Sequence, residues 1–237
     1  MGHGVHEVTD ALAMSFDKVL PFVLAFEGGY QARRDDPGNV APHGIGGGTN
    51  RGITQRTYDA YKDSLDLPYK PVRYITDAEV REIYRRDYWA IPSGPSIVLN
   101  AGKPLLAAVH FDWGVHGGTK KARVFLQAAV RTFPDGAWGP NTLDAIAKCQ
   151  DRQAAGELLR LRVAHHWVRC TDSPRARDVL LAAKIPNMRG VWPTYSASAR
   201  GWLKGWLARV RSLAHILELP IHASFEQGAE AHDYQNP

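Results

Sequence analysis

The stretch FDKVLPFVLAFEGGY, residues 16–30, reads as a helix that ends on an acidic residue. Its apolar residues recur at the spacing of one helix face: Phe16, Val19, Leu20 and Val23. Continuing the same series reaches Glu27, which therefore shares that face. Two glycines follow, and glycine is the usual residue at a left-handed helix end, so the sequence predicts a helix over 17–27.

The position of Glu27 disfavours a negative charge in two ways. A buried face has a low dielectric constant, and the last turn of a helix presents carbonyl groups and the negative end of the helix dipole. Both effects favour the protonated carboxyl group that a general acid requires. Glu27 is therefore a candidate proton donor, and the competing interpretation is a glutamate at a helix end that reaches solvent.

Length and composition indicate a globular protein. The chain has 237 residues, of which 44% are hydrophobic, enough for an ordinary core. No run approaches 18 uninterrupted apolar residues, and the N-terminal segment has no basic start followed by an apolar stretch. We therefore expect a soluble protein made in the cytoplasm without a signal peptide and without stable membrane insertion. Cys149 and Cys170 are expected to be free thiols.

The charge distribution is mildly basic apart from the C-terminal end. The net charge is +5, while the segment EQGAEAHDYQNP at the end contains three acidic residues and no Lys or Arg. A basic body suits a polyanionic partner such as a bacterial cell wall, an acidic membrane or nucleic acid. Solubility alone explains the charge equally well. Because the basic residues are dispersed and no motif for stacking on bases occurs, we expect no nucleic-acid partner.

Hydrophobic periodicity predicts a mainly α protein. A Gly-rich segment with a short hairpin follows the first helix, and Thr76 with Glu79 forms a capping box that opens another helix. The segment PLLAAVHFDWGVHGG, residues 104–118, is apolar nearly all round and is predicted to be a central helix. Further helices are expected near 120–133, 141–149, 152–170, 175–184 and 198–217, with Thr119 capping the first of these and Trp202 and Trp206 in the core.

The Gly-rich loop supplies polar groups that complement a proton donor. They are Asp35, Asp36, Thr49, Asn50, Arg51 and Thr54. Cleavage of a glycosidic bond needs an acid on the leaving oxygen and a carboxylate or a positioned water on the other face of the ring. A donor at a helix end with acceptors on an adjoining loop satisfies this requirement. For Asp36 a simple turn-forming role is an equal alternative, because Asp-Pro-Gly is also a turn sequence.

Four segments occur in a recognisable order: FEGGY (26–30), DDPG (35–38), TNRGIT (49–54) and IYRRDYW (83–89). This order resembles the glycoside hydrolase 108 family of phage and bacterial muramidases over about residues 16–113. The resemblance implies a lysozyme-like fold with Glu27 as the catalytic glutamate. It also implies that Asp36 and Thr49 hold the attacking water or stabilise the cationic transition state. The insertion NVAPHGIGGG, residues 39–48, departs from the family pattern.

A second resemblance lies in FLQAAVRTFPDGAWGPNTLDAI, residues 125–146, which is similar to peptidoglycan-binding modules. The matching residues are Leu126, Gln127, Asp135, Gly136, Gly139, Pro140 and Thr142. A structural role explains the same residues, since the glycines permit a tight loop and Asn141 or Thr142 caps the next helix. Wall binding and scaffold are therefore both open for this half of the chain.

The two resemblances imply a division of the chain and an overall fold class. Residues 1–15 are a predicted N-terminal extension, 16–103 a lysozyme-like catalytic region, 104–222 a helical region and 223–237 a disordered tail. The expected fold is mainly α: a lysozyme-like α+β region with a small Gly-rich β/loop lobe, followed by a C-terminal helical bundle.

Aromatic and polar residues near the predicted site are candidates for substrate binding. They are Tyr30, Asn50, Tyr88, Trp89, Asp112 and Trp113, and Tyr84 is a further aromatic candidate. Aromatic rings pack against the apolar faces of sugar rings while polar groups bind the hydroxyl groups. Most buried aromatic residues, however, belong to the core.

Two other classes of function compete with a glycosidase. His110, Asp112 and His116 suggest a zinc-dependent peptidase or amidase, but six residues separate the histidines, which places them on opposite sides of a helix. The other class is a non-catalytic cell-wall-binding protein. The favoured prediction is a monomeric muramidase without metal or cofactor. It cleaves the β-1,4 bond between N-acetylmuramic acid and N-acetylglucosamine of peptidoglycan, after release by a membrane-permeabilising partner or another export route.

Overall fold

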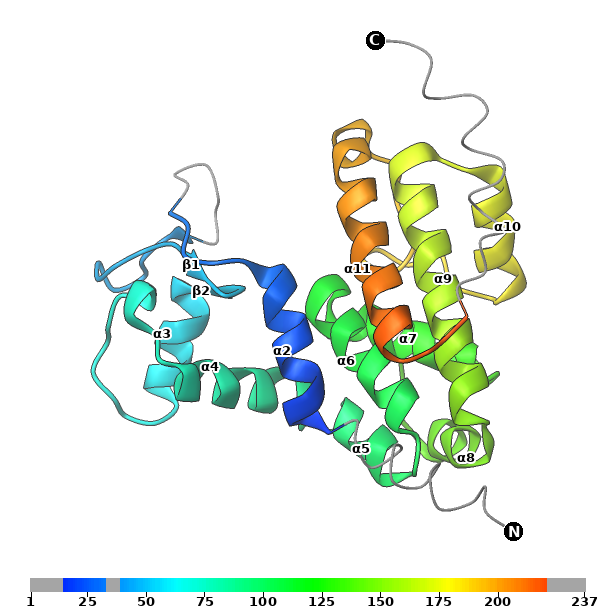
Figure 1. Cartoon of the computed structure of the whole chain (residues 1–237), viewed down its shortest axis with the longest axis horizontal. Coiled ribbons are helices and arrows are strands. Elements are labelled where there is room, and N and C mark those ends of the chain that lie inside the picture. Colours follow the sequence, from blue (N-terminus) through cyan, green and yellow to red (C-terminus); the bar gives the residue numbers. More distant parts are fainter. Residues whose placement is uncertain (1–14, 33–38, 221–237) are drawn as a thin grey trace. The chain divides into compact units, whose positions relative to one another are not determined.

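The computed structural model describes residues 15–32 and 39–220 (Figure 1). The chain divides into two compact units, Phe16–Ala90 and the residues from Ile91 onward. This boundary precedes the division after residue 103 that the sequence predicts. The predicted tail, most of the predicted N-terminal extension, and Asp36 lie outside the described residues.

The first unit combines helices with one small sheet. Its elements are α2 (Phe16–Glu27), β1 (Thr49–Asn50), β2 (Ile53–Thr54), α3 (Gln55–Asp63), a 3-10 turn (Val72–Tyr74), α4 (Asp77–Tyr84) and a π-helical turn (Arg85–Trp89). The apolar part of the predicted face of α2 is confirmed, because its buried residues are Phe16, Val19, Leu20 and Val23. Glu27, which was predicted to share this buried face, is only half-buried, because it ends the helix beside the exposed residues Gly28 and Gly29. The predicted capping box of α4 is confirmed as well, with Thr76 and Glu79 in reciprocal hydrogen bonds.

A two-residue turn joins β1 to β2, and the three together form a hairpin. The strands pair antiparallel, with Asn50 opposite Ile53 and Thr49 opposite Thr54. The connecting residues Arg51 and Gly52 have φ of +51° and +76°, as the tight hairpin turn with two positive φ angles requires. The short hairpin predicted within the Gly-rich loop is therefore confirmed.

The second unit is helical. Its elements are α5 (Pro95–Asn100), α6 (Pro104–Gly117), α7 (Thr119–Ala129), α8 (Pro140–Lys148), α9 (Asp151–Thr171), α10 (Pro174–Ala182), a 3-10 turn (Ala197–Trp202) and α11 (Leu203–Ile216). As predicted, α6 is central: it packs against α5, α7 and α9, while α9 also packs against α10 and α11. The mainly α class with a small two-stranded sheet is confirmed for the described residues.

A buried ion cluster ties three of these helices together. Asp112 of α6 pairs with Arg162 of α9 and with Arg209 of α11. The side chains of Asp112 and Arg162 have no exposed surface, and that of Arg209 is 5% exposed. Burial alone would raise the pKa of Asp112, but the two guanidinium groups outweigh it and lower the pKa below the ordinary value.

Three local predictions in the second unit are wrong. Thr119 is the first residue of α7 and does not cap it, because Gly118 occupies the N-cap. Gly139 precedes α8 at the N-cap with Pro140 at the first position, so neither Asn141 nor Thr142 caps that helix. Trp202 is 60% exposed and lies outside the core.

Candidate active site around Glu27

Glu27 is the last residue of α2 and is partly exposed. Its carboxylate lies against the hairpin turn: a Cβ placed on Gly52 would be 2.9 Å from Glu27 Oε2 and 2.5 Å from Tyr84 Oη. The absence of a side chain at Gly52 therefore lets the turn approach both polar groups. A side chain that is both reachable from solvent and fixed by a neighbouring turn is suited to donate a proton to a bound substrate.

Two tyrosines lie near Glu27 and the hairpin turn. Tyr84 of α4 is buried and donates a hydrogen bond of 2.8 Å to the carbonyl oxygen of Arg51 in the turn. Its ring lies 5.6 Å from the ring of Tyr88. The pKa of the Tyr88 phenol is raised, chiefly by burial and then by the charges of Asp87 and Glu27. We refer to Glu27, Gly52, Tyr84 and Tyr88 as the Glu27 cluster.

Replacing Gly52 by alanine should misplace Glu27. The new methyl group would overlap Glu27 Oε2 and Tyr84 Oη, and we expect about a tenfold to hundredfold loss of hydrolytic rate, since displacements near 1 Å can cost about that much. Gly102→Ala is the matched control, because Gly102 has a similar φ of +75° with nothing within 4 Å of the added Cβ. Rates on wall material, measured beside thermal unfolding, test this prediction. Equal activity of the two variants would contradict it.

Thr49 belongs to a polar network that borders the hairpin. Its hydroxyl group donates to Asn39 Oδ1 at 2.8 Å, and its backbone pairs with that of Gln31 through two hydrogen bonds of 2.8 Å. The side-chain amides of Gln31 and Asn39 also bind each other. This network holds the chain that follows Glu27 to β1, in the same unit as the Glu27 cluster.

Four of the residues predicted to bind substrate are buried structural residues. Asn50 is 9% exposed and donates to the carbonyl oxygens of Val72 and Arg73 at 3.2 and 3.3 Å. Trp89, 6% exposed, packs on the ring of Phe16. Asp112 and Trp113 are 0% and 1% exposed in the core of the second unit. We therefore leave these four side chains out of the proposed site.

Tyr30 is the most exposed of the residues predicted to bind substrate. It is 43% exposed, and its hydroxyl group donates to the carbonyl oxygen of Gly47 at 3.2 Å. Two residues connected with Tyr30 were not predicted from the sequence: Arg73, whose guanidinium carbon lies 5.3 Å from the Tyr30 ring centroid, and Gln55, which accepts a hydrogen bond from the backbone of Gly47. Neither carries a local signal, because their partners come from other segments of the chain.

The motif that resembles peptidoglycan-binding modules forms an internal hydrogen-bond network. Gln127 is 1% exposed, and its Nε2 donates to Asp135, Ala137 and Thr142 while its Oε1 accepts from the backbone of Gly136. The hydrogen bonds from Gln127 and the backbone of Ala137 lower the pKa of Asp135. These contacts give the motif a structural role. Wall binding by this region stays a prediction.

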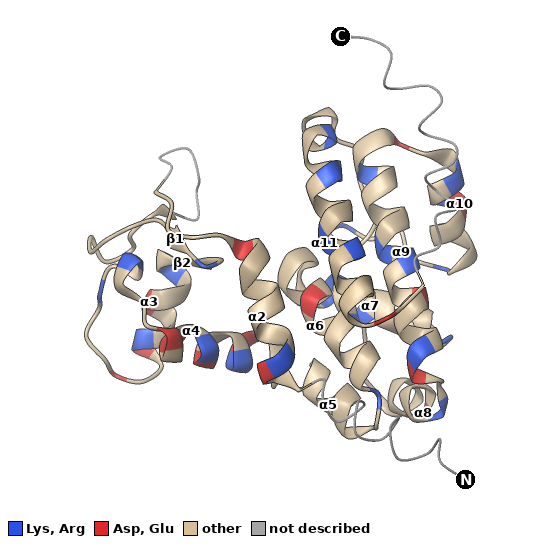
Figure 2. Ribbon diagram, in the orientation of Figure 1, with Lys and Arg blue, Asp and Glu red and all other residues tan. Residues whose placement is uncertain are grey.

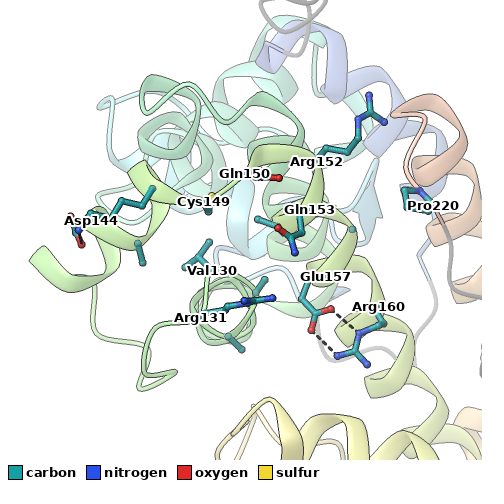
Figure 3. A pocket seen from close by; sticks show the side chains of 16 residues that line it. Val130, Arg131, Asp144, Cys149, Gln150, Arg152, Gln153, Glu157, Arg160 and Pro220 are labelled. Atoms are coloured by element: carbon teal, nitrogen blue, oxygen red, sulfur yellow. Dashed lines mark hydrogen bonds and ion pairs between the residues drawn. The ribbon is translucent and has the colours of Figure 1, made fainter.

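A groove of about 1000 Å³ lies in the second unit, where the end of α7 and helix α8 meet α9 (Figure 3). Its lining includes four cationic residues: Arg131, Lys148, Arg152 and Arg160. Two of them are already paired with acidic residues of the lining, Arg160 with Glu157 and Lys148 with Asp144. None of the residues that were predicted for catalysis or substrate binding and that the structure describes lines this groove.

The histidines of the HFDWGVH segment do not form a metal site. Burial lowers the pKa of His110 to about 4, and its Nε2 lies 3.3 Å from the carbonyl oxygen of Ser93. Burial, followed by the charges of Arg162 and Arg209, lowers the pKa of His116 to about 3. Within residues 15–32 and 39–220, no group of three or more His, Cys, Asp or Glu side chains is arranged to hold a metal ion.

Two further observations concern possible partners. In the part of the chain that the structure describes, no helix has both the length and the apolar character needed to cross a membrane. Lys and Arg residues are scattered over helices of both units (Figure 2).

The segment that contains the Glu27 cluster is similar to a known family. A family model described as glycosyl hydrolase 108 matches residues 20–118, which is less than half of the chain. This match supports a glycosidase and agrees with the family resemblance seen in the sequence motifs. A search of curated proteins gave no match.

Among solved structures, the chain is similar to "Structure of Brucella abortus SagA", with 24% identity and a TM-score of 0.55. The alignment covers 91% of this chain and 97% of the other. At this identity the similarity concerns the fold. The fold is therefore shared over nearly the full length of both chains, including the helical second unit.

Proposed function

We propose that the protein is a peptidoglycan hydrolase of the muramidase type, which cleaves the β-1,4 bond between N-acetylmuramic acid and N-acetylglucosamine. The observation that carries this proposal is the position of Glu27. It is a partly exposed acid at the end of α2, held against Gly52 of the hairpin, within the segment that matches the glycosyl hydrolase 108 family.

In the proposed mechanism Glu27 donates its proton to the glycosidic oxygen as the bond to the sugar breaks. Asp36 and Thr49 hold the attacking water or stabilise the positive charge that develops on the sugar ring. The Glu27 cluster fixes the acid, because Gly52 limits the position of its carboxylate and Tyr84 ties α4 to the turn through Arg51. A fixed donor needs little rearrangement when the substrate binds.

The proposed biological setting is lysis of the bacterial cell wall by a monomeric, phage-type endolysin. The enzyme would be made in the cytoplasm and would reach the wall through a membrane-permeabilising partner or another export route. The mildly basic net charge of +5 supports attraction to a wall that carries carboxylate groups. The second unit acts as a scaffold in this proposal, and a pull-down with intact sacculi tests whether its Gln127 motif also binds the wall.

The products of digestion test the proposed function directly. Purified sacculi are treated with the parent enzyme, the soluble fragments are reduced with borohydride, and their masses are determined. A muramidase gives fragments that end in reduced N-acetylmuramic acid, and a metal chelator leaves their yield unchanged. Fragments that end in reduced N-acetylglucosamine, or new amino termini that vanish with chelator, would contradict the proposal. Binding to sacculi without soluble products would indicate a wall-binding protein.

A further inference from the structure

An exposed cation lies between two exposed aromatic residues in the first unit. The guanidinium carbon of Arg73 lies 5.3 Å from the ring centroid of Tyr30 and 5.3 Å from that of Tyr74. The two tyrosines are 43% and 65% exposed. We refer to Tyr30, Arg73 and Tyr74 as the Arg73 patch. The folded chain thus holds a cation and two aromatic rings together at its surface, where such a contact between exposed groups contributes little to stability.

A buried glutamine explains how the patch is assembled. Gln55 has no exposed surface, and its Oε1 accepts hydrogen bonds from the backbone N–H groups of Gly47 and Val72, at 3.1 and 2.7 Å. Gly47 also accepts the hydroxyl hydrogen bond of Tyr30, and Val72 begins the turn that carries Arg73. One buried side chain therefore joins the two segments that bear the patch.

The backbone at Gly48 packs closely against the ring of Tyr30. A Cβ placed on Gly48 would be 2.9 Å from Tyr30 Cε2, and Gly48 has a φ of +100°. Both facts require glycine at this position. The orientation of the Tyr30 ring is consequently set by the backbone of Gly48 and by the hydrogen bond from its hydroxyl group to Gly47.

The patch shares its framework with the Glu27 cluster. The side chain of Asn50 binds the carbonyl oxygens of Val72 and Arg73, and two residues further on Gly52 lies against Glu27. Tyr30 follows Glu27 by three positions. A single hairpin therefore connects the proposed proton donor with the turn that presents Arg73.

Two other cationic residues of the first unit, Arg51 and Lys62, already form ion pairs with carboxylates, in contrast to Arg73. Arg51 pairs with Asp77 and donates to the carbonyl oxygen of Ile75 at 2.7 Å. Lys62 is paired with Glu79. The Arg73 guanidinium lies over the two rings, and among the described residues no carboxylate accepts its N–H groups. Its hydrogen-bond donors remain available to a ligand.

We propose that the Arg73 patch binds a carboxylate of the glycan substrate and makes the enzyme selective for anionic over neutral β-1,4 glycans. This inference rests on the proposed function. A planar guanidinium group binds a carboxylate through two parallel hydrogen bonds, and the two rings pack against the apolar face of a sugar. The carboxylate comes from a stem peptide of peptidoglycan or from the lactyl group of muramic acid that carries no peptide.

The test compares Arg73→Gln and Arg73→Lys with the control Arg56→Gln, which removes an exposed arginine from the first unit outside the patch. Three substrates are used: intact peptidoglycan, glycan strands freed of peptides by an amidase, and a neutral N-acetylglucosamine hexasaccharide. Kd from calorimetry and KM with kcat are measured for each, and circular dichroism verifies folding. The binding measurement does not depend on cleavage.

Arg73→Gln should weaken binding of the anionic glycan that carries the recognised carboxylate and raise its KM by about tenfold to a hundredfold, because a charge-assisted hydrogen-bond pair is lost. Binding of the neutral hexasaccharide should be unchanged, and Arg73→Lys should keep part of the affinity. A loss confined to intact peptidoglycan assigns the carboxylate to the stem peptide, and a loss confined to bare strands assigns it to the lactyl group. Equal effects on all three glycans, or none beyond Arg56→Gln, would overturn the inference. Absence of cleavage by the parent on every glycan would instead refute the proposed function.

Discussion

Glu27→Gln should lower the rate of peptidoglycan lysis by about a hundredfold to ten-thousandfold, which corresponds to a barrier about 3–5 kcal/mol higher. An amide has the shape of the carboxyl group but cannot deliver a proton to the glycosidic oxygen. Loss of turbidity of purified walls, followed over time, measures the effect. Binding of walls should persist, because the variant alters the reacting group and leaves the rest of the Glu27 cluster in place.

The control for this variant is Glu82→Gln. Glu82 lies on α4 of the same unit, and its ion pair with Arg85 is exposed, at 42% and 52% of the two side chains. The same chemical change there should leave lysis near the parental rate. Thermal unfolding should be similar for both variants. Near-parental lysis by Glu27→Gln would rule out general acid catalysis by this residue.

Asp112→Asn should lower the free energy of unfolding by about 3–5 kcal/mol, because it leaves two buried guanidinium groups without their counter-charge. Arg162 and Arg209 both bind this carboxylate, and all three side chains are almost completely buried. They join α6, α9 and α11, so the loss should affect the second unit as a whole. Urea unfolding followed by fluorescence and circular dichroism measures the difference.

Asp144→Asn serves as the control for the buried cluster. Asp144 pairs with Lys148 one helical turn away, and the two side chains are 60% and 75% exposed. An exposed pair of this kind contributes about 0.3–0.5 kcal/mol, so the control should be close to the parent. If the two variants had equal stability, Asp112 would not have the structural role that its contacts indicate. Loss of lysis at full stability would return Asp112 to the candidates for the site.

Elements that depend on residues close together in the sequence could be predicted. Contacts between distant segments, such as that of the hairpin with Glu27, could not. The buried face of α2 and the capping box at Thr76 depend on residues within one or two helical turns. The turn at Gly52 was predicted as a short hairpin, but its contact with Glu27 was not. That contact joins segments 25 residues apart in the sequence, and no periodicity reports it.

Asp112 illustrates why some candidate site residues could not be distinguished from core residues. Its partners Arg162 and Arg209 lie 50 and 97 positions away in the chain. An acidic residue on an apolar helix predicts either a functional group or a buried ion pair, and only the fold decides between them. The same reasoning applies to Arg73, whose two aromatic neighbours are brought together by Gln55.

A crystal structure of the Glu27→Gln variant with a bound muramic acid-containing tetrasaccharide tests the proposed chemistry most directly. We expect the carboxamide at position 27 to lie about 3 Å from the glycosidic oxygen of the bond to be cleaved, because a general acid must reach the proton acceptor within hydrogen-bond distance. A bound sugar whose glycosidic oxygens all lie beyond the reach of residue 27 would contradict it.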